Sequence, residues 1–467
     1  MSTLARPTAH VPALLTGRPR VQPRWIWGKH ERRRWTVFAI KFGIFLGLPW
    51  ITVGGAPALL FDVPDRQYHL FGQVFWPQDF YLLGLFFAIA AFLLFFTTAL
   101  IGRLWCGFAC PQTLLTSLFM LLDDWIEGDR ASRLAMDHAP FKPAHLARRA
   151  LKHAVWLLVA GFFGFTFTSY FVGAHELLQR AWTHTLALPY VGLWVFISGI
   201  TYLFAGHLRD WVCTTVCPYG RFQGAMQDVD SLLVTYDRVH GEPRGKSKEI
   251  VLRGGCVDCG QCVAVCPMGI DIRQGYQYEC ISCMRCIDAC DATMTRLHQP
   301  VDLIRLASQQ ERDTHEQQPE APLTPLAQHH WWRPRLTWYA AVLAALVGAL
   351  VVLLVNRPLL AVEVDRDRNA VFALPHGQAS NLYALTLVNK DTKPHRVQLA
   401  LDGLDGRLVM GTNPLTLAPG AITHVDASVL APRPGDRPVP VRFTLRDEAG
   451  ALRGTARATF FAPGSTR

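Results

Sequence analysis

The stretch "CVDCGQCVAVCPMGIDIRQGYQYECISCMRCIDAC", residues 256–290, decides how the central part of this 467-residue chain folds. It holds eight of the twelve cysteines, in two runs whose successive gaps are two, two and three residues. Thiolates are soft metal ligands, so this repeated short spacing indicates bound metal rather than packing. The first run is Cys256, Cys259, Cys262 and Cys266, and the second is Cys280, Cys283, Cys286 and Cys290.

The spacing is typical of two-cluster ferredoxins, in which three cysteines of a run hold one [4Fe–4S] cluster and the fourth holds the partner cluster. On that rule the ligands of the first cluster are Cys256, Cys259, Cys262 and Cys290. The ligands of the second cluster are Cys280, Cys283, Cys286 and Cys266. A proline follows the first run but not the second, which predicts a different local turn with the ligands intact.

Two other interpretations fit these eight cysteines less well. Zinc sites also use Cys-x2-Cys pairs, but three cysteines at two-residue gaps with a fourth after three more fit iron–sulfur better. A disulfide framework needs an oxidising compartment, whereas the charge pattern of the chain predicts that this segment is cytoplasmic.

Five segments are long and apolar enough to cross a lipid bilayer, which takes about 20 residues. They lie at roughly 36–56, 80–102, 154–174, 190–206 and 338–355. We therefore expect a polytopic α-helical membrane protein with five spans and soluble parts.

Basic residues predict the orientation of these spans. The first 34 residues are rich in arginine, the connection at 57–79 has only Arg66, and the connection at 103–153 is basic again. The positive-inside rule then places the N-terminus and the ferredoxin-like domain in the cytoplasm and the C-terminal domain outside. "RRRW" at 32–35 is also compatible with twin-arginine export, although orientation already explains the charge.

The formal net charge of +10 is explained by the same features. Orientation in the membrane and contact with anionic lipid account for it. No nucleic-acid partner is expected.

The other four cysteines form two pairs, which we call the motif cysteines: Cys106, Cys110, Cys213 and Cys217. They lie in "RLWCGFACPQT" (103–113) and "VCTTVCPYGRFQ" (212–223), each at the cytoplasmic end of a predicted span. The shared Cys-x3-Cys-Pro pattern indicates an internal repeat.

The prolines of these motifs favour the first position of a new helix, so we expect Cys110 and Cys217 to cap helices. A helix N-terminus stabilises thiolate, and Arg103, Arg209 and Arg221 lie close in sequence. The pairs are therefore predicted to be reactive or metal-binding, with Cu(I) as a suitable ion. Simple packing of buried cysteines is the alternative.

These features divide the chain into six predicted parts. They are a basic cytoplasmic tail (1–35), a four-span membrane domain (36–206), a cytoplasmic ferredoxin-like domain (207–307), a polar linker (308–337), a fifth transmembrane helix (338–356) and a C-terminal domain (357–467). The last part has short alternating runs such as "NLYALTLVNKD" (381–391), which predict an immunoglobulin-like β-sandwich. It has no cysteine, so contact or shielding is its expected role.

The whole pattern resembles the cytochrome c oxidase accessory protein family, CcoG, also called FixG or RdxA. The resemblance covers nearly all of the chain from about residue 30. It rests on the two Cys-x3-Cys-Pro stretches, on "YDRVHGEPRG" (236–245), on the eight-cysteine segment and, more loosely, on "NLYALTLVNKD". The family pattern usually has Arg where this chain has His240, a departure that is not expected to touch its central features.

The resemblance implies a bacterial cell inner-membrane protein that serves assembly of a cbb3-type cytochrome c oxidase. The implied activity is reduction of Cu(II) to Cu(I), which copper chaperones or assembly factors then receive. On this chain, electrons from an unknown donor would reach the two clusters and pass to copper near the motif cysteines. Two alternatives stay open: a quinol-linked membrane ferredoxin that serves another redox partner, and a non-enzymatic scaffold for oxidase assembly.

Overall fold

The computed structural model describes residues 21–53, 56–64, 66–246, 255–318, 333–374, 378–391, 393–432 and 438–461. The chain forms two compact units. The first comprises residues 1–47, 84–169 and 174–348, and it contains all twelve cysteines. The second comprises residues 48–83, 170–173 and 349–467.

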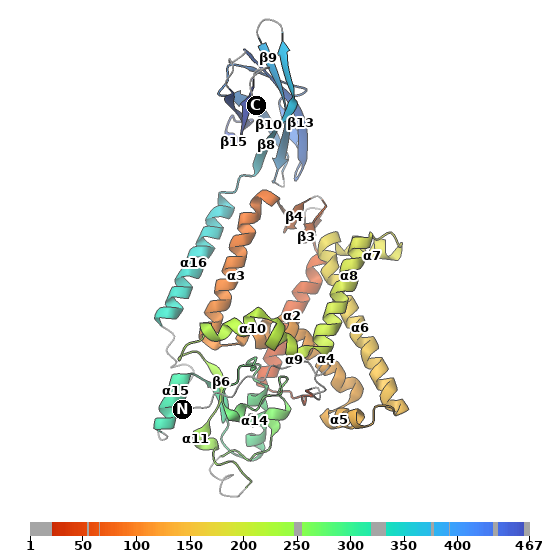
Figure 1. The fold of residues 1–467 in the computed structure, drawn as a ribbon, viewed down its shortest axis with the longest axis vertical. Helices are drawn as coiled ribbons and strands as arrows, with labels where there is room; N and C mark the ends of the chain where they lie inside the picture. The colour runs from red at the N-terminus through yellow and green to blue at the C-terminus, as the bar shows by residue number, and fades with distance from the viewer. Residues whose placement is uncertain are drawn as a thin grey trace. The chain divides into compact units, whose positions relative to one another are not determined.

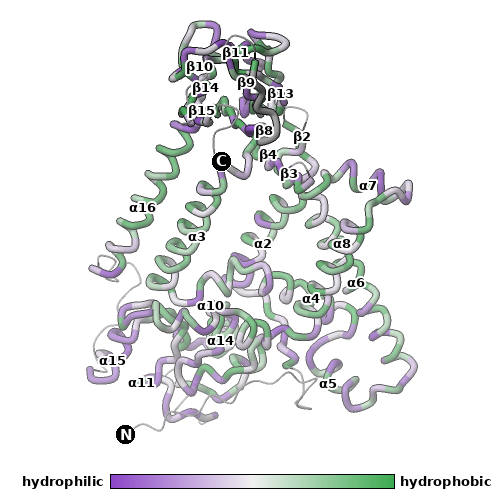
Figure 2. The backbone as a smooth tube through the Cα atoms, turned by 45° about the horizontal axis from the view of Figure 1, so that its top comes forward, coloured by the Kyte–Doolittle hydropathy of each residue, from purple (hydrophilic) through white to green (hydrophobic). Residues whose placement is uncertain are grey.

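Four helices in the described parts of the chain are long and apolar enough to cross a membrane. They are α3 (Phe80–Ile101), α6 (Pro143–Val172), α8 with the π-helical turn that continues it (Leu188–His207), and α16 (Pro334–Val355). Figure 2 shows that hydrophobic residues dominate α3, α8 and α16. The chain is therefore a membrane protein by the length and composition of its helices.

The fifth expected span, 36–56, is not confirmed. The helix at this place, α2 (Lys29–Gly47), begins earlier, with several charged residues, and ends earlier. Its apolar part from Trp35 to Gly47 is only about 20 Å long at about 1.5 Å per residue, short of the roughly 30 Å hydrocarbon core. A 3₁₀ turn (Leu48–Trp50) follows it.

Shorter helices connect the long ones in the first unit (Figure 1). α4 (Pro111–Glu127) and α5 (Arg130–His138) follow the first motif, and α10 (Pro218–Phe222) follows the second. α7 (Ala174–Trp182) lies between α6 and α8 in the chain. The segments after the two motifs therefore differ in length, although the motifs repeat.

The eight-cysteine segment belongs to a small domain around a two-stranded antiparallel sheet. β6 (Leu233–Tyr236) pairs with β7 (Ile304–Ala307), and Val234, Ile287 and Met294 lie in its core. Among its described residues, this domain, which we call the cluster domain, also contains the helices α11 (Arg238–Gly241), α13 (Gln261–Ala264), α14 (Arg285–Arg296) and α15 (Gln309–Gln317).

The prediction that residues 308–337 form a linker is wrong for its first part. Residues Gln309–Gln317 form helix α15, and the Ser308 side chain caps it by accepting a hydrogen bond from the backbone N–H of Glu311. "SQQE" at 308–311 is a Ser-x-x-Glu capping signature. Residues 319–332 lie outside the described ranges, and α16 begins at Pro334, before the predicted start at 338.

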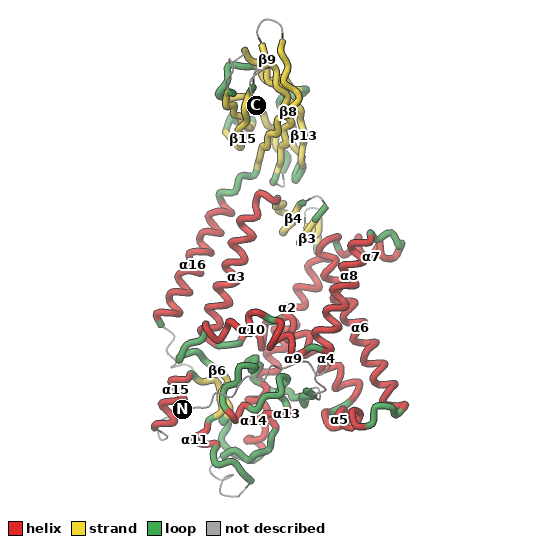
Figure 3. Tube along the Cα trace, in the orientation of Figure 1, coloured by secondary structure: helices red, strands yellow, loops and turns green. Residues whose placement is uncertain are grey.

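In the described residues, the second unit contains a β-sandwich of eight strands and a small sheet that precedes α3. The immunoglobulin-like sandwich is as predicted, and its strands are drawn in yellow in Figure 3. One sheet has the order β11-β13-β9-β8 and the other β12-β10-β14-β15, with antiparallel pairing. Tyr383, Phe443 and Phe460 are fully buried between the sheets. The strands are β8 (Leu360–Leu374), β9 (Gln378–Asn389), β10 (His395–Asp402), β11 (Arg407–Met410), β12 (Leu415–Leu417), β13 (Ile422–Pro432), β14 (Val439–Asp447) and β15 (Leu452–Phe460).

The small sheet of the second unit is tied to the base of the sandwich by buried charges. Its strands are β3 (Leu59–Asp62), β4 (Gln67–Leu70) and β5 (Gln73–Phe75), and a further pair, β1 (Thr52–Val53) and β2 (Ala56–Pro57), precedes it. Asp79 accepts from Arg357 at 2.6 Å and from Lys390 at 2.9 Å. Residues 48–83 therefore fold with the C-terminal domain.

Candidate redox site

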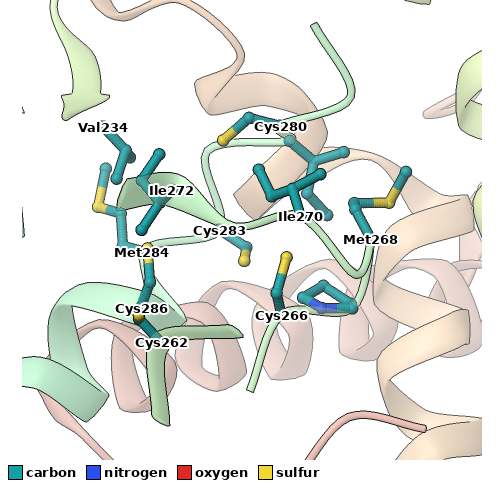
Figure 4. Close-up of a pocket in the computed structure, with 12 residues that line it drawn as sticks. Val234, Cys262, Cys266, Met268, Ile270, Ile272, Cys280, Cys283, Met284 and Cys286 are labelled. Atoms are coloured by element: carbon teal, nitrogen blue, oxygen red, sulfur yellow. The ribbon is translucent and has the colours of Figure 1, made fainter. Parts of the chain in front are cut away.

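Two cavities of the first unit are each lined by four or more cysteines. One is lined by Cys256, Cys259, Cys262 and Cys290. The other is lined by Cys262, Cys266, Cys280, Cys283 and Cys286. In Figure 4 the sulfur atoms of Cys266 and Cys283 face each other within this second cavity. The four cysteines predicted for each cluster thus line one cavity, and Cys262 lines both cavities.

Left-handed backbone turns place the cysteines of each run. Asp258 and Gly260 have positive φ in the first run, and Ser282 and Met284 have it at the equivalent places of the second run. Non-glycine residues rarely adopt this conformation, and such strain is common at functional sites. Gly260 and Met284 also stand directly before α13 and α14, so each run turns into a helix in the same way.

The cysteines of both cavities are mostly shielded from water. Burial raises the pKa of Cys262 and Cys280 to about 11 and that of Cys266 and Cys290 to about 12. Free thiols here are therefore protonated at neutral pH, whereas metal coordination deprotonates a thiol. Cys259 is the exposed member of the set.

The sulfur positions bear on the choice between zinc and iron–sulfur. A tetrahedral zinc site with Zn–S bonds of about 2.3 Å brings its sulfurs to about 3.8 Å from one another. Among the described residues, the one trio of potential ligands with all donor atoms within 4.8 Å of one another contains no cysteine. The cysteines that line each cavity are thus spaced more widely than the ligands of a tetrahedral zinc ion, which favours a larger, thiolate-ligated cluster.

The two Cys-x3-Cys-Pro motifs have the same local structure. Each begins with a π-helical turn, Trp105–Ala109 and Val212–Val216, and such turns are frequent at functional sites. The backbone N–H of Cys110 donates to Trp105 O at 2.8 Å, and that of Cys217 donates to Val212 O at 2.8 Å. Both cysteines then cap a helix that begins with proline, as predicted.

The motif cysteines converge against the second cavity. Cys106 and Cys213 pack against a small hydrophobic core that contains Cys280, Ile281 and Cys283. The other three motif cysteines lie close enough to Cys106 for a negative charge on any of them to raise the pKa of its thiol. The sequence predicts a duplicated site, but only the fold brings its halves together beside the cluster domain.

Gly107 of the first motif lies close against the cluster domain. A Cβ atom at this position would lie 2.6 Å from the backbone oxygen of Ser282 and 2.8 Å from that of Ile281. These residues stand between Cys280 and Cys283. Only glycine therefore allows the motif to sit this close to the second cavity.

Glu31, Arg34 and Arg285 form a buried ion-pair cluster, which links the start of α2 and the first motif to the cluster domain. The Glu31 carboxylate accepts from Arg285 at 2.8 and 2.9 Å and from Arg34 at 2.6 Å. Arg34 also donates to the carbonyl oxygen of Gly107 at 2.7 Å, and Arg285 directly precedes Cys286. All three side chains are nearly inaccessible to water.

Sequence reasoning missed this ion-pair cluster because the basic N-terminal residues already had an explanation in membrane orientation. Asp288 of α14 reinforces it by accepting from the backbone N–H groups of His30 and Glu31. The start of α2 is thus fixed to the cluster domain. A buried acid inside a basic run, Glu31 in "KHERRR", was the available signal.

Among the predicted arginines, Arg103 lies close enough to Cys106 and Cys213 for its charge to affect their thiols. It is buried, donates to Gly220 O at 2.6 Å and lies over the Tyr278 ring. Burial raises the pKa of the Cys106 thiol, and Arg103 partly opposes this; burial likewise raises the pKa of Cys213 to about 12.

The expectation that Arg209 and Arg221 assist the thiolates is not confirmed. Arg209 is paired with Asp123 at 2.7 Å, and Arg221 is exposed to solvent. The lowered pKa expected near the motifs is thus not found for Cys106 and Cys213, whose thiols are buried.

Comparison with known proteins locates these features in a family. The chain is 37% identical to protein RdxA of Cereibacter sphaeroides over 84% of each chain. It is 32% identical to the nitrogen fixation protein FixG of Rhizobium meliloti over 96% of this chain and 94% of the relative. It is 34% identical to protein RdxB of Cereibacter sphaeroides over 85% of each chain. The chain belongs to the FixG/RdxA family.

Family models describe three segments of this FixG/RdxA member. Residues 208–309 match a 4Fe-4S dicluster domain, residues 83–127 match a 4Fe-4S binding domain, and residues 350–463 match the IG-like fold at the C-terminal of FixG. The protein is thus an iron–sulfur, oxidoreductase-like member of its family. Residues 83–127 contain only Cys106 and Cys110, so this segment has no complete four-cysteine ligand set of its own.

A crystal structure of a FixG-related protein from Vibrio parahaemolyticus matches 22% of this chain and 96% of that chain, at 23% identity and a TM-score of 0.20. This likeness is too weak to bear on the fold.

Proposed function

We propose that this protein is a membrane-bound iron–sulfur oxidoreductase that reduces Cu(II) to Cu(I) for the maturation of a cbb3-type cytochrome c oxidase. One observation carries the proposal: Cys106 and Cys213 pack directly on the loop that holds Cys280 and Cys283. Soft sulfur ligands for copper and the cysteines of an iron–sulfur domain therefore share one buried region.

In this proposal Cys256, Cys259, Cys262 and Cys290 hold one [4Fe–4S] cluster, and Cys266, Cys280, Cys283 and Cys286 hold the other. The clusters, when bound, store and release single electrons. The rest of the chain positions these ligands. The ion-pair cluster fixes Arg285 beside Cys286 and, through Arg34, holds the carbonyl of Gly107 next to Cys106.

The motif cysteines are the proposed place where copper, the substrate, is bound. Burial keeps the thiols of Cys106 and Cys213 protonated, so copper displaces their protons on binding. Each Cu(II) takes one electron and becomes Cu(I), which thiolates favour. The Cu(I) is then available to an assembly factor or copper chaperone, and the electron comes from a donor protein or quinol.

We further propose that α2 forms the fifth span together with the apolar 3₁₀ turn Leu48–Trp50, which lengthens its apolar part, and that the protein lies in a bacterial inner membrane. The start of α2 is held by Asp288 of the cluster domain, whereas residues 48–83, which follow it, fold with the C-terminal domain. The chain then returns through α3 to Cys106. These connections support a cytoplasmic cluster domain and N-terminus, with a periplasmic C-terminal domain.

The test is Cu(I) formation by the full-length protein, reduced anaerobically and supplied with Cu(II) and a Cu(I)-specific chelator. Replacing both Cys110 and Cys217 by serine is expected to lower the rate at least 10-fold. Iron, sulfide and the EPR signals of the reduced clusters are expected to stay unchanged. Thr215→Ser in the second motif is the matched control. An unchanged rate in the double variant would remove copper chemistry from the motif cysteines.

The same preparation separates this proposal from the two alternatives. Rapid reduction of the clusters by a quinol analogue without copper binding selects the quinol-linked ferredoxin. Normal oxidase assembly by a variant that lacks both clusters selects the scaffold.

A further inference from the structure

A trio of side chains outside the redox site brings three metal-ligand atoms together: Asp237, His240 and His315, which we call the triad. Asp237 and His240 stand at the start and inside of α11, and His315 lies on α15. The sequence separates the two histidines by 75 residues, and the two helices lie next to each other in the cluster domain (Figure 1).

The donor atoms of the triad have the separations of a metal site. Asp237 Oδ2 lies 2.8 Å from His240 Nδ1 and 3.5 Å from His315 Nε2, and the two ring nitrogens are 3.4 Å apart. A tetrahedral ion with ligands at about 2.0–2.1 Å places neighbouring donor atoms about 3.3 Å apart.

The fold prepares the triad for a cation. Asp237 Oδ1 accepts the backbone N–H groups of Val239 and His240, which orients the carboxylate and leaves Oδ2 for the histidines. Such support of a ligand by neighbouring groups is typical of metal sites. The side chains of Asp237 and His315 are 6% and 8% exposed, so this carboxylate is shielded from water.

One ring must turn for both nitrogen lone pairs to point at a single ion, because the two imidazoles are stacked at 23°. His240 can make this turn because its side chain is 51% exposed. Water is available to complete the coordination on that open side.

We propose that Asp237, His240 and His315 bind one divalent first-row transition-metal ion. Two imidazoles and one carboxylate suit Zn(II), and Cu(II) binds such donors still more tightly. The ion links α11 to α15. It lies close to the first cluster's ligands, because Gly241 of α11 accepts the backbone N–H of Cys256. This inference does not depend on copper reduction at the motif cysteines.

The experiment measures Zn(II) binding to the full-length, cluster-containing protein, in competition with a chromophoric chelator under anaerobic conditions. His240→Asn and His315→Gln are each expected to lose one equivalent of Zn(II), with affinity at that site at least 100-fold weaker. His298→Asn is the matched control: His298 is exposed in the same domain, and asparagine tolerates its left-handed backbone.

Two further measurements show whether a loss of Zn(II) binding comes from the triad itself and not from misfolding or from zinc bound to cysteines. Equal iron and sulfide contents in all variants show that the domain is intact. Zinc also has to slow hydrogen exchange of residues 309–317 in the wild type and in the control, but not in the triad variants. Unchanged Zn(II) stoichiometry and affinity in both triad variants would overturn the proposal and leave a hydrogen-bonded triad.

Discussion

At the scale of single residues, charge inside the protein couples the membrane part to the cluster domain. Burial opposes ionisation of Glu31, but the guanidinium groups of Arg285 and Arg34 outweigh it and lower its pKa to about 2. Removing one member of a buried ion pair leaves its partners uncompensated, which is costly. Glu31 is therefore a positioning residue whose effect reaches both Cys286 and the first motif.

Glu31→Gln is expected to destabilise the protein by about 3–5 kcal/mol, the usual cost of breaking a buried pair. The measurement is denaturant-induced loss of cluster absorbance in detergent. Glu176→Gln is the control, because the exposed pair Glu176–Arg180 is expected to contribute about 0–1 kcal/mol. Equal destabilisation by the two substitutions would refute the special role of Glu31.

The lowered pKa of Glu31 also predicts how the stability difference between the wild type and Glu31→Gln depends on pH. A carboxylate with a lowered pKa contributes stability above its unfolded pKa, here 4.5, and loses it as the pH falls toward about 2. The stability gap between wild type and Glu31→Gln is therefore expected to be constant from pH 7 to pH 5 and to shrink below about pH 4.5. Denaturation series at pH 7, 6, 5 and 4 check this, and a gap that closes by pH 5 would contradict it.

At the scale of elements, local pattern explains the cysteine runs, and tertiary contact explains what lies beside them. Spacing alone predicts which cysteines share a cavity, because two-residue gaps leave few ways to turn the chain. Prolines likewise predict the caps at Cys110 and Cys217. The sequence does not reveal that Gly107 touches Ser282, since the two are far apart in the chain and no pattern links them.

Two elements were predicted wrongly or incompletely, for physical reasons. The polar composition of 308–317 concealed α15, although its capping signature was present. The sequence shows that His240 replaces the usual Arg of the family pattern, but only the structure shows that α15 brings His315 next to it. In α2 the apolar run was visible, but the position at which the helix ends was not.

Gly107→Ala tests the contact between the first motif and the cluster domain. The added Cβ would meet backbone oxygens at 2.6 and 2.8 Å, which cannot move aside as a side chain can. We expect Cu(I) formation to fall at least 10-fold with iron content retained. Gly224→Ala near the second motif has open space for its Cβ and is expected to match the wild type. Wild-type activity in Gly107→Ala would show that close packing is not needed.

At the level of the complete chain, the membrane topology depends on whether α2 crosses the bilayer. Four described helices qualify as spans. With α2 as a fifth, the N-terminus and the C-terminal domain lie on opposite sides of the membrane. Without it, they lie on the same side.

Reporter fusions in a bacterial host decide between these topologies. Fluorescence of a green fluorescent protein at the N-terminus is expected, together with activity of alkaline phosphatase fused after residue 467, because the latter needs the oxidising periplasm to form its disulfides. If the N-terminal green fluorescent protein is dark while the C-terminal alkaline phosphatase is active, α2 does not cross the membrane.

The most direct test of the central claim, that the motif cysteines and the cluster domain form one redox site, is a single turnover. Fully reduced protein is mixed anaerobically with one equivalent of Cu(II) in a stopped-flow instrument, and cluster absorbance and chelated Cu(I) are followed together. In the wild type, reoxidation of the clusters is expected to match Cu(I) formation in rate and amount, and in the Cys110→Ser/Cys217→Ser variant the clusters are expected to stay reduced. Equal reoxidation in both proteins would contradict the claim.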